Sequence, residues 1–243
     1  MVERNLTRRD LLKGAAAASL AAMAAPYVIP AAARGAEGAK AIFNGKDLTD
    51  WDGDPRFWSV KDGAITGITT KEVPTPGNTF IIWRGGVLKD FELHVAWRLE
   101  NHNSGIQYRS KDRDKWVVNG YQADMDGSGT YTGILYEEGG RGIAAEVGQK
   151  VTLGPDGKPK VTGTVSDPKD VKAAIKLKDW NEYVITGRGN HLVQKINGIV
   201  TVDVTDDDEK RRAMEGILAF QLHAGPPMKV QFKDITLKVF EAK

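Results

Sequence analysis

Short runs in which apolar and polar residues alternate fill most of the chain from Ile42 onward. In residues 91–99, FELHVAWRL, every odd position is apolar and most even positions are polar. A period of two is that of a strand with one buried face, because successive side chains point to opposite sides. The same alternation predicts strands in residues 105–109, 182–187, 191–196, 199–204, 216–223 and 229–240.

Residues that favour turns separate these runs. Asn197-Gly198 is typical of a type I′ turn and predicts a tight hairpin. Gly225-Pro226-Pro227 joins the last two predicted strands, and Pro155-Asp156-Gly157 marks a hairpin tip or an inserted loop within residues 152–160. Many short strands with such turns indicate a two-sheet sandwich or a barrel.

Helical patterns are scarce. Residues 169–176 after Pro168 and residues 206–214, with acidic residues at their start, could each form a short helix. Two short helices cannot supply the regular alternation of helix and strand that an α/β fold needs. The sequence therefore predicts a single all-β domain.

The first residues have a different texture. Residues 7–13, TRRDLLK, carry a twin-arginine pattern, and an alanine-rich apolar run and the small residues Ala31 to Ala33 follow it. This combination is typical of a twin-arginine export signal, and the apolar run of about twelve residues is too short to span a bilayer. We expect residues 1–36 to be a signal peptide with a short linker, cleaved near Ala33, and residues 37–243 to form the domain.

Charge and cysteine content narrow the function classes. Residues 1–33 contain four Lys or Arg and two Asp or Glu, so their removal lowers the formal net charge from +2 to about zero. No basic patch remains to bind nucleic acid, and no charge draws the domain to a membrane after cleavage. The absence of cysteine excludes disulfides and thiolate metal sites. We expect a periplasmic or secreted protein whose partners are the twin-arginine export machinery and a small ligand.

Residues 120–142 concentrate polar side chains in a glycine-rich segment. Gln122, Asp124 and Asp126 share one face of a predicted strand, and Glu138 and Arg141 follow closely. A row of acceptors beside a cation suits polar-ligand binding or acid–base chemistry. A solvated strand and turn would explain the segment equally well, so its position alone leaves both interpretations open.

Several motifs, taken in order, resemble one known family. They are FNGKDLTDW at 43–51, NSGIQYR at 103–109, WNEY at 180–183, the Asn197-Gly198 turn, GILAFQLH at 216–223 and FKDI at 232–235. Their order and spacing resemble the domain of unknown function 1080 family, also described as the 3-keto-disaccharide or 3-keto-glycoside hydrolase domain. The resemblance runs from about residue 42 to residue 240, with Lys233 and Asp234 standing where Arg and Asn are common.

The resemblance implies a concanavalin-A-like jelly-roll sandwich of two antiparallel sheets with a groove for sugars. It also implies an exported protein that acts on oxidised glycosides. Residues 120–142 are then expected to form one wall of the groove, opposite Gln221 and His223.

A 3-keto-glycoside can be cleaved by elimination. The ketone acidifies the hydrogen on C2, a base removes this proton, the oxygen on C1 leaves, and water then adds across the enone. The site needs a base, a donor or cation for the enolate oxygen, and an acid for the leaving group. A divalent cation such as calcium could assist at the ketone, but the chemistry does not demand one.

The candidate residues follow from these roles. His223 is one candidate base, Asp124 and Glu138 are competing bases or metal ligands, and guanidinium groups suit the enolate or ring hydroxyls. The expected catalytic residues are His223, Asp124, Glu138 and Arg141, and the expected substrate-binding residues are Gln107, Arg109, Tyr121, Gln122, Tyr136 and Gln221. For either arginine, the alternative is an ion pair with a neighbouring carboxylate.

Other aromatic and histidine residues have weaker claims. Trp83 and Trp116 could stack on a pyranose ring, whereas Trp51 and Trp97 are expected in the core. The remaining histidines are His94, His102 and His191. None forms a metal-ligand pair on one element, and His102 is expected in a turn.

Two further functions compete with the keto-elimination hypothesis. A conventional glycosidase of the same architecture would use two carboxylates, about 5–5.5 Å apart for a retaining enzyme. Gln122 stands where the strand of alternating acids would begin, which removes one carboxylate. A non-catalytic carbohydrate-binding module would need only the groove.

Overall fold

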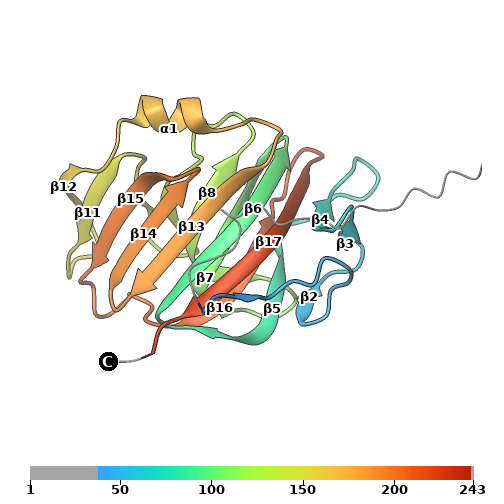
Figure 1. Ribbon diagram of the computed structural model, residues 1–243, viewed down its shortest axis with the longest axis horizontal. Coiled ribbons are helices and arrows are strands. Elements are labelled where there is room, and N and C mark those ends of the chain that lie inside the picture. The colour runs from blue at the N-terminus through green and yellow to red at the C-terminus, as the bar shows by residue number, and fades with distance from the viewer. Residues whose placement is uncertain (1–37, 242–243) are drawn as a thin grey trace, which may run out of the picture.

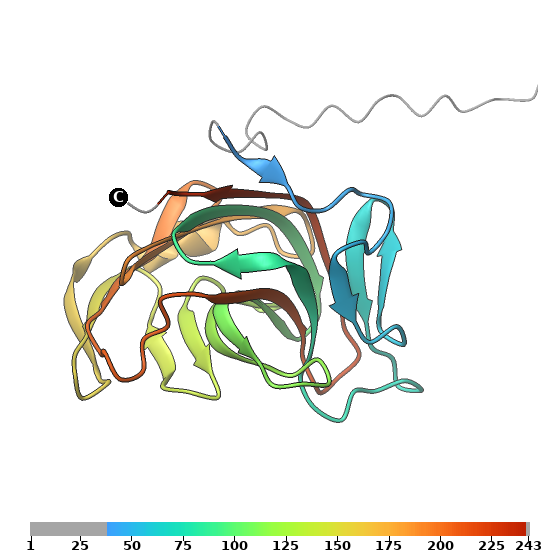
Figure 2. The same cartoon turned by 90° about the horizontal axis from the view of Figure 1, so that it is seen from below.

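Two β-sheets packed face to face make up the domain (Figure 1). The computed structural model describes residues 38–241. Figure 2 shows the two sheets edge-on as layers that curve together. The predicted all-β jelly roll is confirmed, while the predicted export signal lies outside the described residues.

The larger sheet has ten strands. Its order is β12 (Pro159–Thr164), β11 (Gln149–Leu153), β15 (Ile199–Asp206), β14 (His191–Ile196), β13 (Asn181–Arg188), β6 (Phe91–Glu100), β17 (Lys229–Val239), β4 (Ala64–Ile68) and β3 (Trp58–Lys61), with β1 (Lys40–Ala41) paired to β17. Neighbours run antiparallel except β11 and β15, which are parallel. The last strand of the chain, β17, therefore lies inside the sheet, between two strands made much earlier.

The smaller sheet has seven strands and is antiparallel throughout. Its order is β10 (Gly142–Ala145), β9 (Leu135–Glu138), β8 (Val118–Asp126), β7 (Asn103–Asp112), β16 (Gly216–Leu222), β5 (Thr79–Leu88) and β2 (Trp51–Gly53). The consecutive strands β16 and β17, joined through Gly225-Pro226-Pro227, belong to different sheets.

The core lies between the sheets, where their alternating apolar residues meet. On β6 the odd positions are buried and the even positions are half-buried, as the sequence pattern predicts. Trp51 of the smaller sheet stacks on Phe220 with ring centroids 4.9 Å apart, and Phe220 stacks on Phe232 of the larger sheet at 4.1 Å. Trp51 and Trp97 are both buried, so their predicted core placement is confirmed.

One of the two predicted helices is present. α1 (Pro168–Ala174) begins after Asp167, whose carboxylate accepts a hydrogen bond of 2.8 Å from the Lys169 amide. The predicted helix at 206–214 is wrong, because Asp206 ends β15 and the following residues form turns. The carboxylates of Asp206 and Asp208 are buried against arginine side chains instead of capping a helix.

Within residues 38–241, no helix is long and apolar enough to cross a membrane.

The feature that matters for function is the outer face of the smaller sheet. On β8, Tyr121, Ala123 and Met125 join the core, so strand alternation points Gln122 and Asp124 to the opposite face.

Candidate active site

A cavity of about 620 Å³ lies over the outer face of the smaller sheet. Its lining comes from β8, β9, β10 and β16 and from the segments beside β5 and β7. The lining residues are Asn78, His102, Asn103, Gln122, Asp124, Asp126, Ser128, Tyr131, Ile134, Tyr136, Glu138, Ile143, Gln221 and His223. Of the described residues that line it, none is Lys or Arg.

A chain of hydrogen bonds fixes the carboxylate of Asp124 in this cavity. Ser110 Oγ donates to Gln107 Oε1 at 2.7 Å, and Gln107 Nε2 donates to Gln122 Oε1 at 2.9 Å. Gln122 Nε2 then donates to Asp124 Oδ1 at 2.8 Å, while Asn103 Nδ2 donates to Asp124 Oδ2 at 3.0 Å. Gln107 is fully buried and supports the site from below without lining the cavity.

The local backbone makes room for this chain. Gln122 leans across β7 at Gly105, where a Cβ atom would overlap the Gln122 side chain. Any larger residue at position 105 would therefore displace the amide that holds Asp124.

The pKa of the Asp124 carboxyl is raised to about 7, chiefly because the group is buried. The hydrogen bonds from Asn103 and Gln122 act in the opposite direction, while the nearby negative charges of Asp126 and Glu138 also raise the pKa. A group with a pKa near 7 is present in both protonation states at neutral pH. Asp124 can therefore either accept or donate a proton under ordinary conditions.

Glu138 lies across the cavity and joins two segments distant in sequence. Its Oε2 accepts a hydrogen bond of 3.1 Å from Gln221 Nε2, and its Oε1 accepts one of 3.5 Å from Asn78 Nδ2. The Gln221 Oε1 atom is buried and has no hydrogen-bond partner among residues 38–241. This free acceptor can take a hydrogen bond from a ligand hydroxyl.

Two histidines share one carbonyl at the rim of the cavity. His223 Nδ1 lies 2.6 Å and His102 Nε2 lies 2.8 Å from Ala224 O, and the rings meet edge to face with centroids 4.6 Å apart. A carbonyl only accepts, so each of these nitrogens carries a hydrogen. In its neutral form, His223 therefore presents Nε2 as a proton acceptor.

Asp126 serves the loop beside the cavity. Its Oδ1 accepts hydrogen bonds of 2.6 Å from both the amide and the hydroxyl of Ser128, and its Oδ2 accepts one from the Tyr131 amide. Its oxygens are thus engaged in holding the turn between β8 and β9.

Comparison with known proteins assigns the chain to a family. A family model described as the 3-keto-alpha-glucoside-1,2-lyase-like domain matches residues 38–238, nearly all of the described chain. The chain belongs to this family. The match confirms the resemblance drawn from the sequence motifs. No curated protein sequence matched the chain.

Solved structures share the fold of this lyase-like domain. Two proteins of Parabacteroides distasonis ATCC 8503, provisionally described as glycosyl hydrolases, both align with a TM-score of 0.57. They are 17% and 20% identical, and the alignments cover 83% and 88% of this chain and 99% of each of theirs. The carbohydrate-binding module CBM66 of Bacillus subtilis aligns with a TM-score of 0.51 at 15% identity, over 79% of this chain and 98% of the module. Family and fold together make the lyase-like domain a carbohydrate-active jelly roll.

The structure brings six of the predicted site residues together in the cavity of the lyase-like domain. These residues are Gln122, Asp124, Tyr136, Glu138, Gln221 and His223. The pKa of Tyr136 is raised by burial and by the charges of Glu138 and Asp124, so its phenol keeps its proton and can donate a hydrogen bond.

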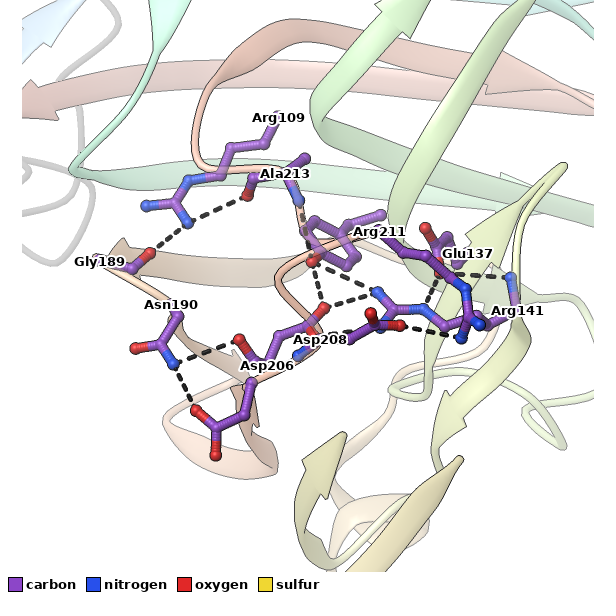
Figure 3. Close-up of polar contacts among 11 residues, drawn as sticks. Arg109, Glu137, Arg141, Gly189, Asn190, Asp206, Asp208, Arg211 and Ala213 are labelled. Atoms are coloured by element: carbon purple, nitrogen blue, oxygen red, sulfur yellow. Dashed lines mark hydrogen bonds and ion pairs between the residues drawn. The ribbon is translucent and has the colours of Figure 1, made fainter. Parts of the chain in front are cut away.

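Arg109 does not reach the cavity. Strand alternation in residues 105–109 would place it on the same face as Gln107, but its φ of 48° and a register shift between Tyr108 and Lys111 break the alternation of β7. Its side chain is 1% exposed and donates to the carbonyl oxygen of Lys89 at 2.8 Å. It also donates to the carbonyl oxygen of Gly189 at 2.6 Å (Figure 3). The predicted role of Arg109 in substrate binding is therefore corrected to a structural one.

Arg141 and Tyr121 also lie elsewhere. Arg141 donates to Asp206 Oδ1 at 3.0 Å and Oδ2 at 2.5 Å and pairs with Glu137 (Figure 3). The Tyr121 hydroxyl also donates to Asp206. Burial alone would lower the pKa of Arg141, but the hydrogen bonds with Asp206 and Glu137 outweigh it and raise the pKa. The ion-pair alternative holds for Arg141, and Tyr121 faces the core because it alternates with Gln122.

The predicted stacking tryptophans are also absent from the lining. Trp116 donates from its indole nitrogen to Asp52 at 2.8 Å, and Trp83 packs against the core. Two other histidines pair with carboxylates away from the cavity, His94 with Glu92 and Glu182, and His191 with Asp203.

The donor set does not fit a divalent cation. Asp126 is engaged with its own loop, and Glu138 and Asp124 each accept hydrogen bonds from two side-chain amides. Over residues 38–241, no three His, Cys, Asp or Glu side chains gather where a metal ion could be held.

Several lining residues were not among the predicted site residues. His102 lies in the turn that the sequence predicts, where Asn101 and His102 both have positive φ values, and its ring contacts Ala224 O. Its place beside the Asn103-Ser-Gly-Ile motif was the available signal. Asn78 carried no signal, because only the tertiary fold brings it to Glu138 and to the Ala224 amide, which donates to Asn78 Oδ1 at 3.0 Å.

Proposed function

We propose that this domain cleaves 3-keto-glycosides by abstraction of the C2 proton and elimination of the C1 leaving group, followed by hydration. The observation that carries the proposal is Asp124, a buried carboxyl whose pKa is about 7, in a cavity with a free histidine acceptor and neutral donors. Membership of the 3-keto-alpha-glucoside-1,2-lyase-like family supports the same chemistry.

His223 and Asp124 divide the proton transfers. His223 Nε2 accepts the proton from C2, and the C–H electron pair forms the enolate. When the enolate collapses to the enone, the C1–O bond breaks and protonated Asp124 gives its proton to the departing oxygen. Asp124, now ionised, accepts a proton from the water that adds to C1, and His223 returns its proton to C2.

Neutral groups stabilise the developing charge. The Tyr136 phenol keeps its proton and can donate to the enolate oxygen, while the free Gln221 Oε1 can accept from a sugar hydroxyl. The carboxylates in the lining, with no lysine or arginine beside them in the described lining, disfavour an anionic sugar. The substrate class is therefore an uncharged glycoside.

We also propose that the domain acts in the periplasm or is secreted. The twin-arginine pattern at residues 7–13 and the small residues that end near Ala33 support export by the twin-arginine machinery.

A substrate comparison tests the function. The protein is incubated with an ordinary glucoside and with its 3-keto counterpart, and release of the aglycone is measured. We expect release from the 3-keto compound alone. Cleavage of the ordinary glucoside alone would identify a conventional glycosidase, and binding without cleavage of either would identify a carbohydrate-binding module.

Two variants test the assigned residues. His223→Ala and Asp124→Asn should each lower kcat by roughly 10²- to 10⁴-fold, the usual contribution of one acid–base group. Both should keep the thermal stability of a folded domain. Asp156→Asn, which changes an exposed carboxylate at the hairpin tip, is the matched control and should be fully active. Wild-type rates in either site variant would refute the assignment.

A further inference from the structure

The two sides of the cavity differ in chemistry. On the side of β16 and β5 it is lined by hydrogen-bonding groups, among them Asn78, Gln221 and His223. At the loop between β8 and β9 and at β10 it is lined by Tyr131, Ile134 and Ile143, beside Tyr136 and Glu138 of β9. A sugar ring alone would not need this second, apolar side.

Tyr131 and Ile143 expose large apolar side chains at this side of the cavity. Tyr131 is 49% and Ile143 is 40% exposed. Single exposed apolar residues are ordinary on a protein surface. These two differ because they line one cavity together with the nearly buried Ile134. An apolar ligand that covers such surface removes it from water, and this removal favours binding.

The loop that carries Tyr131 is held in place. Asp126 accepts hydrogen bonds from the amides of Ser128 and Tyr131, and Thr132 Oγ1 accepts one of 2.9 Å from the Asp126 amide. A charged acceptor that binds several amides of one turn fixes the backbone on both sides of Tyr131. The exposed ring is thus presented by an ordered loop, which reduces the entropy lost when a ligand binds.

Two polar side chains of this loop, Ser128 and Asp126, already form hydrogen bonds within the loop. Ser128 Oγ donates to Asp126 and lies 2.7 Å from Thr130 Oγ1, and both Asp126 oxygens accept from the loop itself. A second sugar placed on this side would find these hydroxyl and carboxylate partners engaged. An apolar group in the same place would lose no hydrogen bonds, because it forms none with water.

We infer that the leaving group of the substrate is an apolar, ring-bearing aglycone, stacked on Tyr131 and flanked by Ile143. The inference rests on the proposed function, because it places the keto sugar over Asp124 and His223. The aglycone then extends toward β10. The substrate class is an uncharged 3-keto-glycoside of an aromatic or alicyclic alcohol, and a disaccharide is a poor substrate.

Benzyl and methyl 3-keto-α-glucosides give a clean comparison, because both release alcohols of similar acidity. We expect kcat/KM for the benzyl compound to exceed that for the methyl compound by at least about tenfold. Tyr131→Ala and Ile143→Ser should each remove most of this preference by lowering kcat/KM for the benzyl compound more than for the methyl compound. Val161→Ser, a similarly exposed apolar residue on β12 outside the cavity lining, is the matched control and should keep the preference.

Titration calorimetry with the unoxidised benzyl and methyl glucosides separates the two proposals. A benzyl preference in binding that Tyr131→Ala abolishes supports the aglycone site, even if neither 3-keto compound is cleaved and the proposed function fails. Cleavage of both 3-keto compounds with no benzyl preference in Kd or kcat/KM overturns the aglycone site and leaves the proposed function intact. Absence of any preference in either measurement also overturns it.

Discussion

Strand β8 separates two groups of buried carboxylates that have opposite electrostatic surroundings. Asp124 on its outer face lies in a cavity whose described lining has no lysine or arginine. On the other side, Tyr121 contacts Asp206, which pairs with Arg141 at 2.5 Å, and Asp208 pairs with Arg211 at 2.9 Å (Figure 3). One group is negative and uncompensated, whereas the other is matched by cations.

The difference distinguishes a group suited to proton transfer from a group suited to stabilising the fold. In the Arg141 group, the hydrogen bonds with Asp206 and Glu137 raise the pKa of the guanidinium, so it keeps its charge and gives up no proton at neutral pH. The side-chain donors that reach the Asp124 carboxylate are the neutral amides of Asn103 and Gln122. Burial and the nearby negative charges raise its pKa to about 7, close to neutral pH. A buried acid without a compensating cation is suited to proton transfer, whereas a buried acid paired with arginine is suited to holding the fold.

Removing the cation from the compensated group should have the largest effect on stability. Arg141→Met leaves Asp206 buried without its cation, and breaking such a pair typically costs about 3–5 kcal/mol. Urea denaturation measures the loss. Arg84→Met is the control, because Arg84 is 42% exposed and its pairs with Asp52 and Asp112 are worth less than about 1 kcal/mol. A loss at Arg141 no larger than at Arg84 would contradict the comparison.

Asp124, in the uncompensated group, should make the free energy of unfolding depend on pH. The pKa of Asp124 rises from 3.8 to about 7 on folding, so the folded state binds a proton more tightly than the unfolded state. Its stabilising contribution is complete below pH 3.8 and is lost as pH rises through 7. From pH 8 to pH 5, wild type should therefore gain roughly 2–3 kcal/mol relative to Asp124→Asn.

This pH effect is measured by the free energy of unfolding of both proteins across the same buffers. The two curves should diverge only above about pH 4. If they run parallel between pH 5 and pH 8, Asp124 keeps an ordinary pKa and cannot serve as the acid.

His94, on the larger sheet, should contribute a smaller pH-dependent stabilisation than Asp124. Its pKa is raised chiefly by the hydrogen bond with Glu182, and the hydrogen bond with Glu92 adds to this. The raised pKa stabilises the fold below the unfolded pKa of about 6.5, and the contribution disappears as pH rises through the folded value. His94→Gln should lose less than about 1 kcal/mol at pH 5 and nothing at pH 9. Equal losses at both pH values would show a packing effect.

The sequence predicts the fold well because its signals are local. Alternation on β6 and β8, the Asn197-Gly198 turn and the short helix after Pro168 all appear as expected. The same alternation places Gln122 and Asp124 on one face and therefore identifies the wall of the cavity.

The errors arise where backbone irregularities and distant contacts decide. A positive φ at Arg109 turns its side chain out of the expected face, and no residue type in NSGIQYR signals this. Arg141 forms a hydrogen bond with Asp206, 65 positions away in the sequence, and Asn78 forms one with Glu138, 60 positions away. Contacts of this range depend on the packing of sheets, which alternation within one strand does not specify.

The position of β17 has a consequence for how the chain folds. Lys229–Val239 pairs with β6 on one side and β4 on the other, and also with β1, so the ten-stranded sheet cannot be joined until this strand emerges from the ribosome. Before then, the β3–β4 hairpin is separated from the rest of its sheet, and β4 and β6 each present an unpaired edge. Such long-range pairing slows folding and leaves the nascent chain open to aggregation or chaperone binding until synthesis reaches β17.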